Sequence, residues 1–175
     1  MDKQAMWQSF GLCAHCPERA IEAALAPKET AGIVAARKWL NSELPFLVIV
    51  GSVGAGKTTA ATWAVMRSGL MARHIRAAEL ATIAPFGNSA GRWYSLRDKR
   101  LLVIDDLGTE HASDWWKSNL DSLIDFRHGQ KLKTIITTNF SLPQIGDVYG
   151  LRVLDRLRQS SIFAACGTAS MRGAA

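Results

Sequence analysis

The octapeptide Gly51-Ser52-Val53-Gly54-Ala55-Gly56-Lys57-Thr58 constrains this chain more than any other feature. It fits the pattern G-x-x-x-x-G-K-[ST] at every fixed position. Before it, residues 46–50 (FLVIV) form a short apolar run rich in β-branched residues, as in a buried parallel strand. After it, residues 58–66 contain neither Pro nor Gly and predict a helix. A strand, a glycine-rich loop and a helix start in this order form a cradle of backbone N–H groups for phosphates.

The pattern also assigns roles inside this cradle. Lys57 is expected to reach the β- and γ-phosphates of ATP, and the Thr58 hydroxyl is expected to bind Mg²⁺. ATP and Mg²⁺ are therefore the predicted cofactors. The residues predicted to bind the nucleotide are Gly51, Ser52, Val53, Gly54, Ala55, Gly56, Lys57, Thr58 and Thr59. The alternative, a glycine-rich turn with a chance lysine, leaves the flanking strand and helix unexplained.

Strand and helix signals alternate from residue 46 onward, which is typical of a parallel sheet with helices on both faces. The predicted strands are 46–50, 73–76, 101–105, 133–137 and 161–165. The predicted helices are 57–67, 77–83, 113–127, 142–148 and 151–158, with a loop over 85–91. Residues 1–44 are expected to form a short helical N-terminal segment with helix-prone stretches at 19–25 and 29–40, and residues 45–175 the core.

Composition and charge narrow the class of protein. The chain has 175 residues, a formal charge of +6 and a pI near 9.5, which fits one basic domain. A net positive charge favours a polyanionic partner, although the same positive electrostatic potential could serve to attract ATP alone. No apolar run reaches the length of a membrane span and no signal-peptide core is present, so a cytoplasmic protein is predicted. Cys13 and Cys16 lack a second ligand pair, which favours reduced thiols over zinc.

A second strong signal is the stretch RLLVIDD over residues 100–106, an apolar strand that ends in two carboxylates. Such a strand places Asp105 and Asp106 at the carboxyl edge of the sheet, where ligands of α/β proteins bind. Asp105 is predicted to hold Mg²⁺, and Asp106 is predicted to orient or deprotonate the attacking water. Asn139 follows the strand at 133–137, and its amide could hydrogen-bond the γ-phosphate or the water.

Two arginines, Arg152 and Arg156, are four residues apart and therefore share one face of a short helix. Leucines at other positions would anchor that helix. Paired arginines on an apolar-backed helix suit an arginine finger, which stabilises the charge that develops on a γ-phosphate. The alternative is a solvated face in which these arginines pair with Asp155.

With these motifs in hand, the chain resembles the AAA+ ATPases of the DnaC/DnaI helicase-loader and IstB transposition-helper family. The resemblance runs from about residue 16 to 172, through GSVGAGKT, RLLVIDDLGTE, SDWW, TIITTNFSL and YGLRVLDRL. It implies an α/β fold, the AAA+ P-loop NTPase core, with strands in the order 5-1-4-3-2. The family's Walker B pair falls on Asp105 and Asp106, and its sensor 1 on Asn139. Its arginine finger falls on Arg156, with Arg152 as companion, which implies a head-to-tail oligomer.

The match is less regular elsewhere. The family's sensor 2 falls loosely on Arg172, and Glu110 is a further candidate for polarising water. Many loaders have Tyr-Gly-Glu-Arg where this chain has Leu151 in third place. The N-terminal helicase-binding domain and the C-terminal helical lid domain of larger members are expected to be absent.

A candidate DNA-binding segment lies between residues 85 and 100, where cations alternate with aromatic residues. Single strands suit such a surface, because phosphates meet cations and bases stack on rings. The residues predicted to bind single-stranded DNA are Arg92, Trp93, Arg97 and Lys99. The alternative is a solvated linker in which Trp93 and Tyr94 pack locally.

Four functions fit these observations. The preferred hypothesis is a DnaC-like ATPase that binds single-stranded DNA and loads or remodels a replicative helicase. A second is an IstB-like transposition helper, which would recognise a transposase and duplex DNA. A third is a non-hydrolysing, ATP-gated adaptor. A small-molecule kinase is a weaker fourth, since nothing in the sequence marks an acceptor pocket.

Overall fold

The computed structural model describes residues 2–167 of the chain. Within them a parallel sheet contains β1 (Phe46–Val50), β2 (Ala72–Arg76), β3 (Leu101–Leu107), β4 (Lys133–Thr138) and β5 (Ser161–Ala165). The strand order is β2-β3-β4-β1-β5, the predicted order written from the other edge, so the expected AAA+ topology is confirmed. Strand β1 lies between β4 and β5 and pairs in register with both, as in the pairs Val48↔Ile136 and Val48↔Phe163.

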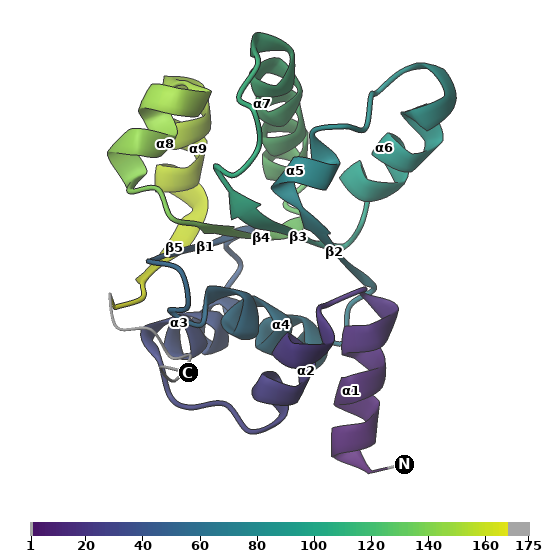
Figure 1. Ribbon diagram of the computed structural model, residues 1–175, viewed down its shortest axis with the longest axis vertical. Helices are drawn as coiled ribbons and strands as arrows, with labels where there is room; N and C mark the ends of the chain where they lie inside the picture. The colour runs from purple at the N-terminus through teal and green to yellow at the C-terminus, as the bar shows by residue number, and fades with distance from the viewer. Residues whose placement is uncertain (1, 168–175) are drawn as a thin grey trace.

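Helices cover both faces of this sheet (Figure 1). On one face lie α1 (Lys3–Cys13), α2 (Glu18–Leu25), α3 (Ala31–Leu40) and α4 (Lys57–Ser68). On the other face lie α5 (Ala77–Leu80), α6 (Ala90–Arg97), α7 (Asp114–Gly129), α8 (Leu142–Tyr149) and α9 (Leu151–Ser160). Each face has its own apolar core, because alternate residues of the strands point to opposite sides. Leu47 and Ile49 lie in the first core, and Phe46 and Val48 in the second.

The N-terminal helices are built into the first core. Ile21 of α2 and Ile33 of α3 are buried with Leu47 of β1, so α2 and α3 share a core with the sheet. α1, which the sequence pattern did not predict, also docks on β2, because Ala14 O accepts a hydrogen bond from His74 N at 2.7 Å. This contact covers part of the backbone edge that a terminal strand would otherwise expose.

The segment between β2 and β3 differs from the predicted loop. A 3₁₀ turn (Gly87–Ser89) leads directly into α6 despite Gly91. Trp93 and Leu96, three residues apart, are buried on one side of this helix, and tertiary packing therefore outweighs the glycine. In α7, Trp116, Leu120 and Leu123 recur at positions i, i+4 and i+7, a spacing that predicts one buried face of a helix, and all three are buried. Among residues 2–167, no helix has both the length and the apolar character needed to cross a membrane.

Candidate nucleotide site

The glycine-rich loop connects the carboxyl end of β1 to the start of α4. Gly54 and Gly56 have φ values of 82° and 81°, a region that costs glycine little and other residues considerably more. Gly56 is also the N-cap of α4, so the first amides of this helix are available to an anion at the loop. The loop therefore has the backbone needed for a phosphate cradle.

The ammonium group of Lys57 lies at the centre of this cradle. Its Nζ donates hydrogen bonds to Gly51 O at 2.8 Å and Ser52 O at 2.9 Å. It also donates to Asn139 Oδ1 at 2.7 Å. The structure thus brings together the P-loop lysine and the predicted sensor residue, which are 82 positions apart in the chain.

Asp105 is buried at the end of β3 and is held by three side chains. Both of its oxygens lie 3.1 Å from the Thr58 hydroxyl, and Thr137 Oγ1 donates to Oδ1 at 2.6 Å. Nε2 of His74 lies 3.2 Å from Oδ2. Burial alone would raise the pKa of Asp105, but His74 and the two hydroxyls outweigh burial and lower that pKa. The carboxylate and the Thr58 hydroxyl are hard oxygen donors and fit a Mg²⁺ ion.

Asp106 lies next to Asp105 but in a different environment. The pairing of β3 with β4 shifts between Ile104 and Leu107, and this bulge contains both aspartates. Asp106 has φ 57°, and its backbone N–H donates to Thr137 Oγ1 at 2.9 Å. Burial and the charge of Asp105 raise its pKa, while Lys57 acts in the opposite direction. A carboxylate with a raised pKa at the sheet edge suits a general base.

Glu110 does not have the geometry expected of a water-polarising residue. Its Oε1 accepts hydrogen bonds from Trp116 Nε1 at 2.9 Å and from the Tyr149 hydroxyl. Its Oε2 accepts from Gly108 N at 3.0 Å. Both oxygens are engaged, so in this conformation Glu110 joins the loop after β3 to α7 and α8. Its predicted catalytic role therefore lacks support from the geometry.

The two arginines of α9 face the acidic side of α7. Arg156 forms an ion pair with Asp125, and its Nη1 lies 3.7 Å from Asp121. Arg152 Nε lies 3.6 Å from Asp121 Oδ2. The Arg152 side chain is 71% exposed and that of Arg156 is 19% exposed. The pairing partners are therefore on α7, rather than Asp155 as the alternative interpretation held.

Comparison with known proteins identifies the family. The model of the family described as IstB-like ATP binding protein matches residues 25–174. The chain belongs to this family. A stretch of 58 residues is 34% identical to the replicative helicase loader DnaC of Escherichia coli (strain K12). That stretch covers 33% of this chain and 24% of the loader, so the chain matches about a quarter of this curated relative's length.

Solved structures of helicase loaders share the fold of this IstB-like protein. The crystal structure of the DnaC helicase loader aligns with a TM-score of 0.73 and 23% identity over 86% of this chain and 99% of that chain. The structure of DnaI aligns with a TM-score of 0.68 and 17% identity over 84% of this chain and 87% of that chain. The predicted resemblance to the DnaC/DnaI and IstB group is confirmed, and the chain is an ATP-binding AAA+ protein.

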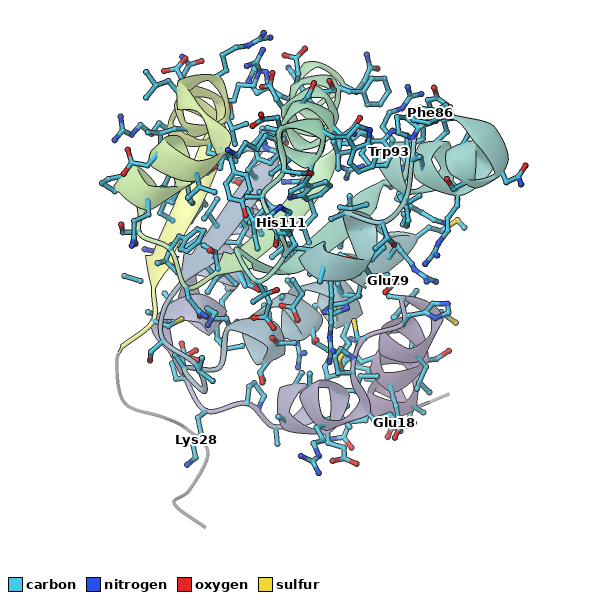
Figure 2. The ribbon with its side chains drawn as sticks, turned by 45° about the horizontal axis from the view of Figure 1, so that its top comes forward. Glu18, Lys28, Glu79, Phe86, Trp93 and His111 are labelled. Carbon is cyan, nitrogen blue, oxygen red and sulfur yellow. The ribbon has the colours of Figure 1, made fainter. Side chains whose placement is uncertain are left out.

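The predicted DNA-binding residues of this IstB-like protein do not form one surface. Trp93 is only 4% exposed and lies on the side of α6 that faces α7 (Figure 2), so it presents no ring for a base to stack on. Arg92 pairs with Glu79, whereas Arg97 pairs with Asp98 and stacks on Tyr94 and Phe126. The exposed aromatic residues of this segment are Phe86 and Tyr94.

Sequence reasoning missed two residues that shape the site and one buried arginine that lies away from it. His74 and Thr137 hold Asp105, and Arg127 is fully buried beneath α6 and β4. A signal was present for His74, because it lies inside the predicted strand 73–76. A polar side chain on the core side of such a strand needs a buried partner. Thr137 carried no such signal, because its partner Asp105 is 32 positions away, and the Arg97 and Lys99 carbonyl groups that accept from Arg127 are 30 and 28 positions away. The remaining predicted residue, Arg172, lies outside the described residues.

Proposed function

We propose that this chain is a Mg²⁺-dependent ATPase whose nucleotide site is the loop Gly51–Thr58. The observation that carries this proposal is the convergence of Lys57, Asn139, Thr58 and Asp105 at one end of the sheet. The loop amides and the Lys57 ammonium would bind the phosphates. Thr58 and Asp105 would hold the metal, which supplies positive charge to the phosphate oxygens.

The chain's own residues account for the hydrolytic step. Asp106, with its raised pKa, takes a proton from the attacking water, and Asn139 orients that water or the γ-phosphate through its amide. Asp105 stays ionised beside it because its pKa is lowered. Two adjacent carboxylates with separated pKa values can thus serve as metal ligand and base.

The proposed enzyme works as a head-to-tail oligomer. Arg152 and Arg156 lie on α9 and pair with α7, so neither is engaged with the loop Gly51–Thr58 of the same chain. On association, these guanidinium groups would exchange Asp121 and Asp125 for the γ-phosphate at a neighbouring copy. A heterologous contact of this kind builds rings or open spirals.

The biological step we propose is the loading or remodelling of a replicative helicase on single-stranded DNA, as the name of the relative DnaC suggests for that protein. The family match to IstB-like proteins favours a second candidate, a transposition helper acting with a transposase. Capture of the purified protein on immobilised helicase, and separately on transposase, distinguishes the two. A non-hydrolysing adaptor remains the third candidate and predicts that Asp106→Asn leaves function intact.

The main test is the ATPase rate as a function of protein concentration, with and without single-stranded DNA. Turnover per chain should rise with concentration in the wild type and should be lost in Arg156→Ala. The matched control is Arg158→Ala, an exposed arginine on the same helix. Turnover that is independent of concentration and equal in all three proteins would reject the interface proposal, and absent turnover throughout would reject the ATPase.

A further inference from the structure

A cavity of about 290 Å³ lies at the β2 edge of the sheet, between the turn that follows α1 and helix α6. This volume is at the lower end of small-ligand sites, which span about 300–1,000 Å³. The polar residues that line it are Cys13, His15, Arg73, Arg92, Ser95 and Lys99. We propose that this cavity is a phosphate-binding site, separate from the loop Gly51–Thr58.

Charge is the first argument for an anion. Arg73, Arg92 and Lys99 bring three positive charges to a small space, and no carboxylate is among the described residues that line it. Glu79 pairs with Arg92 from α5 and offsets one of these charges. The remaining imbalance is unfavourable in a partly enclosed site and would be relieved by a bound anion.

The second argument is an unused donor. Arg73 Nε is buried, and no group within residues 2–167 accepts a hydrogen bond from it. A buried donor without a partner is costly, and such groups often mark a ligand or ion that completes them. Arginine forks and hydroxyl groups, here with Ser95 nearby, recognise phosphate oxygens well because several donors converge on one tetrahedral group.

The site groups residues differently from the surface predicted from the sequence. Arg92 and Lys99 belong to the cavity, together with Arg73 and His15 from other elements. Arg97 lies instead in a second groove between α6 and α7. His15 is held in place because Ala14 O is bonded to β2 and because its own N–H donates to Leu12 O at 2.9 Å.

Two sources can supply the phosphate, a free phosphate compound or the backbone of a nucleic-acid strand. The second source would deepen the DNA-binding part of the proposed function, whereas neither source depends on ATP hydrolysis. The test uses the full chain with Lys57→Ala, which weakens phosphate binding at the P-loop. Inorganic phosphate is titrated by ³¹P line broadening, and a labelled oligo-dT is titrated by fluorescence anisotropy over a range of salt concentrations.

Adding Arg73→Gln and Lys99→Gln should weaken the binding of the relevant probe by about tenfold or more, since charge-assisted hydrogen bonds are lost. Arg19→Gln with Lys38→Gln removes the same charge from exposed positions on α2 and α3, outside the cavity, and should change binding much less. Lys99→Glu, in the loop after α6, repeats the test without altering β2. Weaker binding of inorganic phosphate in the variants indicates that the site takes a free phosphate compound. Weaker binding of oligo-dT alone indicates that it takes the backbone of a nucleic-acid strand. Equal binding of both probes in all variants, or no binding of either, would overturn the proposal.

Discussion

Asp105 and Asp106 are adjacent in the chain, yet their environments shift their pKa values in opposite directions. Thr137 links them, since its hydroxyl donates to Asp105 Oδ1 and accepts from Asp106 N. The bulge in β3 turns one carboxylate toward Thr58 and His74 and leaves the other half-buried near Lys57. At the scale of single residues, the opposite pKa shifts therefore come from the backbone and from neighbouring groups, because the two side chains are chemically identical.

The first prediction concerns pH. Asp106 must be ionised to accept a proton, and burial together with Asp105 raises its pKa. The ATPase rate should therefore be constant above this raised pKa and should fall about tenfold per pH unit below it. Asp106→Asn should retain ATP binding and lose turnover by about a hundredfold or more. The measurements are kcat and nucleotide affinity over a pH series, and a rate that stays constant down to about pH 4, the ordinary range of aspartate, would contradict this role.

The second prediction concerns Arg127, which is fully buried on α7. Its guanidinium donates to Thr134 Oγ1 and to the carbonyl groups of Arg97, Lys99 and Lys133. Burial lowers its pKa to about 9, so the group stays protonated at neutral pH.

Arg127→Met fills a similar space but removes the donors of these acceptors. The free energy of unfolding should fall by about 3 kcal/mol or more, since each buried acceptor left without a donor costs about 1–3 kcal/mol. Urea denaturation measures this, with Arg100→Met as the exposed control. Equal unfolding midpoints in the two variants would show that Arg127 is dispensable.

At the scale of elements, Glu110 connects the site to the arginine helix. It accepts hydrogen bonds from Trp116 of α7 and Tyr149 of α8, and Tyr149 is followed by Gly150 and then by α9. A change in the loop after β3 can therefore alter the position of α8 and α9. Burial and Glu110 raise the pKa of Tyr149, which keeps its hydroxyl protonated as a donor.

The third prediction follows from this connection. Tyr149→Phe should leave ATP affinity unchanged. It should lower kcat, and the dependence of kcat on protein concentration, by about tenfold to a hundredfold, because one hydrogen bond to a charged group is lost. Tyr94→Phe is the matched control, because Tyr94 is the other tyrosine of the chain and is exposed. If both variants retain the wild-type rate and concentration dependence, the hydrogen bond between Tyr149 and Glu110 does not control the placement of α9 for catalysis.

Sequence patterns predicted the elements well where packing agreed with local preference. Strand β1, the P-loop and the stripe on α7 were predictable because a period of two or of 3.6 residues matches their burial. α6 was not predicted, since Gly91 argues against a helix that only the burial of Trp93 and Leu96 explains. α1 has a weak apolar pattern and depends on its contacts with α4 and β2.

At the scale of the whole molecule, the fold and the nucleotide loop were predictable, whereas the network around them was not. Motif spacing located Lys57, Asp105 and Asn139, because parallel strands end at one edge of the sheet. His74, Arg127 and the bonds of Glu110 depend on side chains that converge from separate elements, and no local pattern encodes such convergence. The basic cavity at β2 likewise exists only after the turn following α1 has docked beside α6.

The last prediction tests the assembly as a whole. In a head-to-tail oligomer, a copy with Lys57→Ala lacks a working loop but still offers Arg156 to its neighbour. A copy with Arg156→Ala keeps the loop but offers no finger. Each variant alone should therefore be inactive, whereas an equal mixture forms interfaces that combine a working loop with a working arginine.

Random association places these two halves together at about one interface in four, so the mixture should recover roughly a quarter of the wild-type ATPase rate. The measurement is steady-state turnover at a fixed total concentration, with the double variant Lys57→Ala/Arg156→Ala mixed with each single variant as the control. These control mixtures contain either no working loop or no working finger, so their rates should remain at background. If each single variant is inactive and their mixture is inactive too, Arg156 acts within its own chain, through its pairing with Asp121 and Asp125, and not at a neighbouring loop.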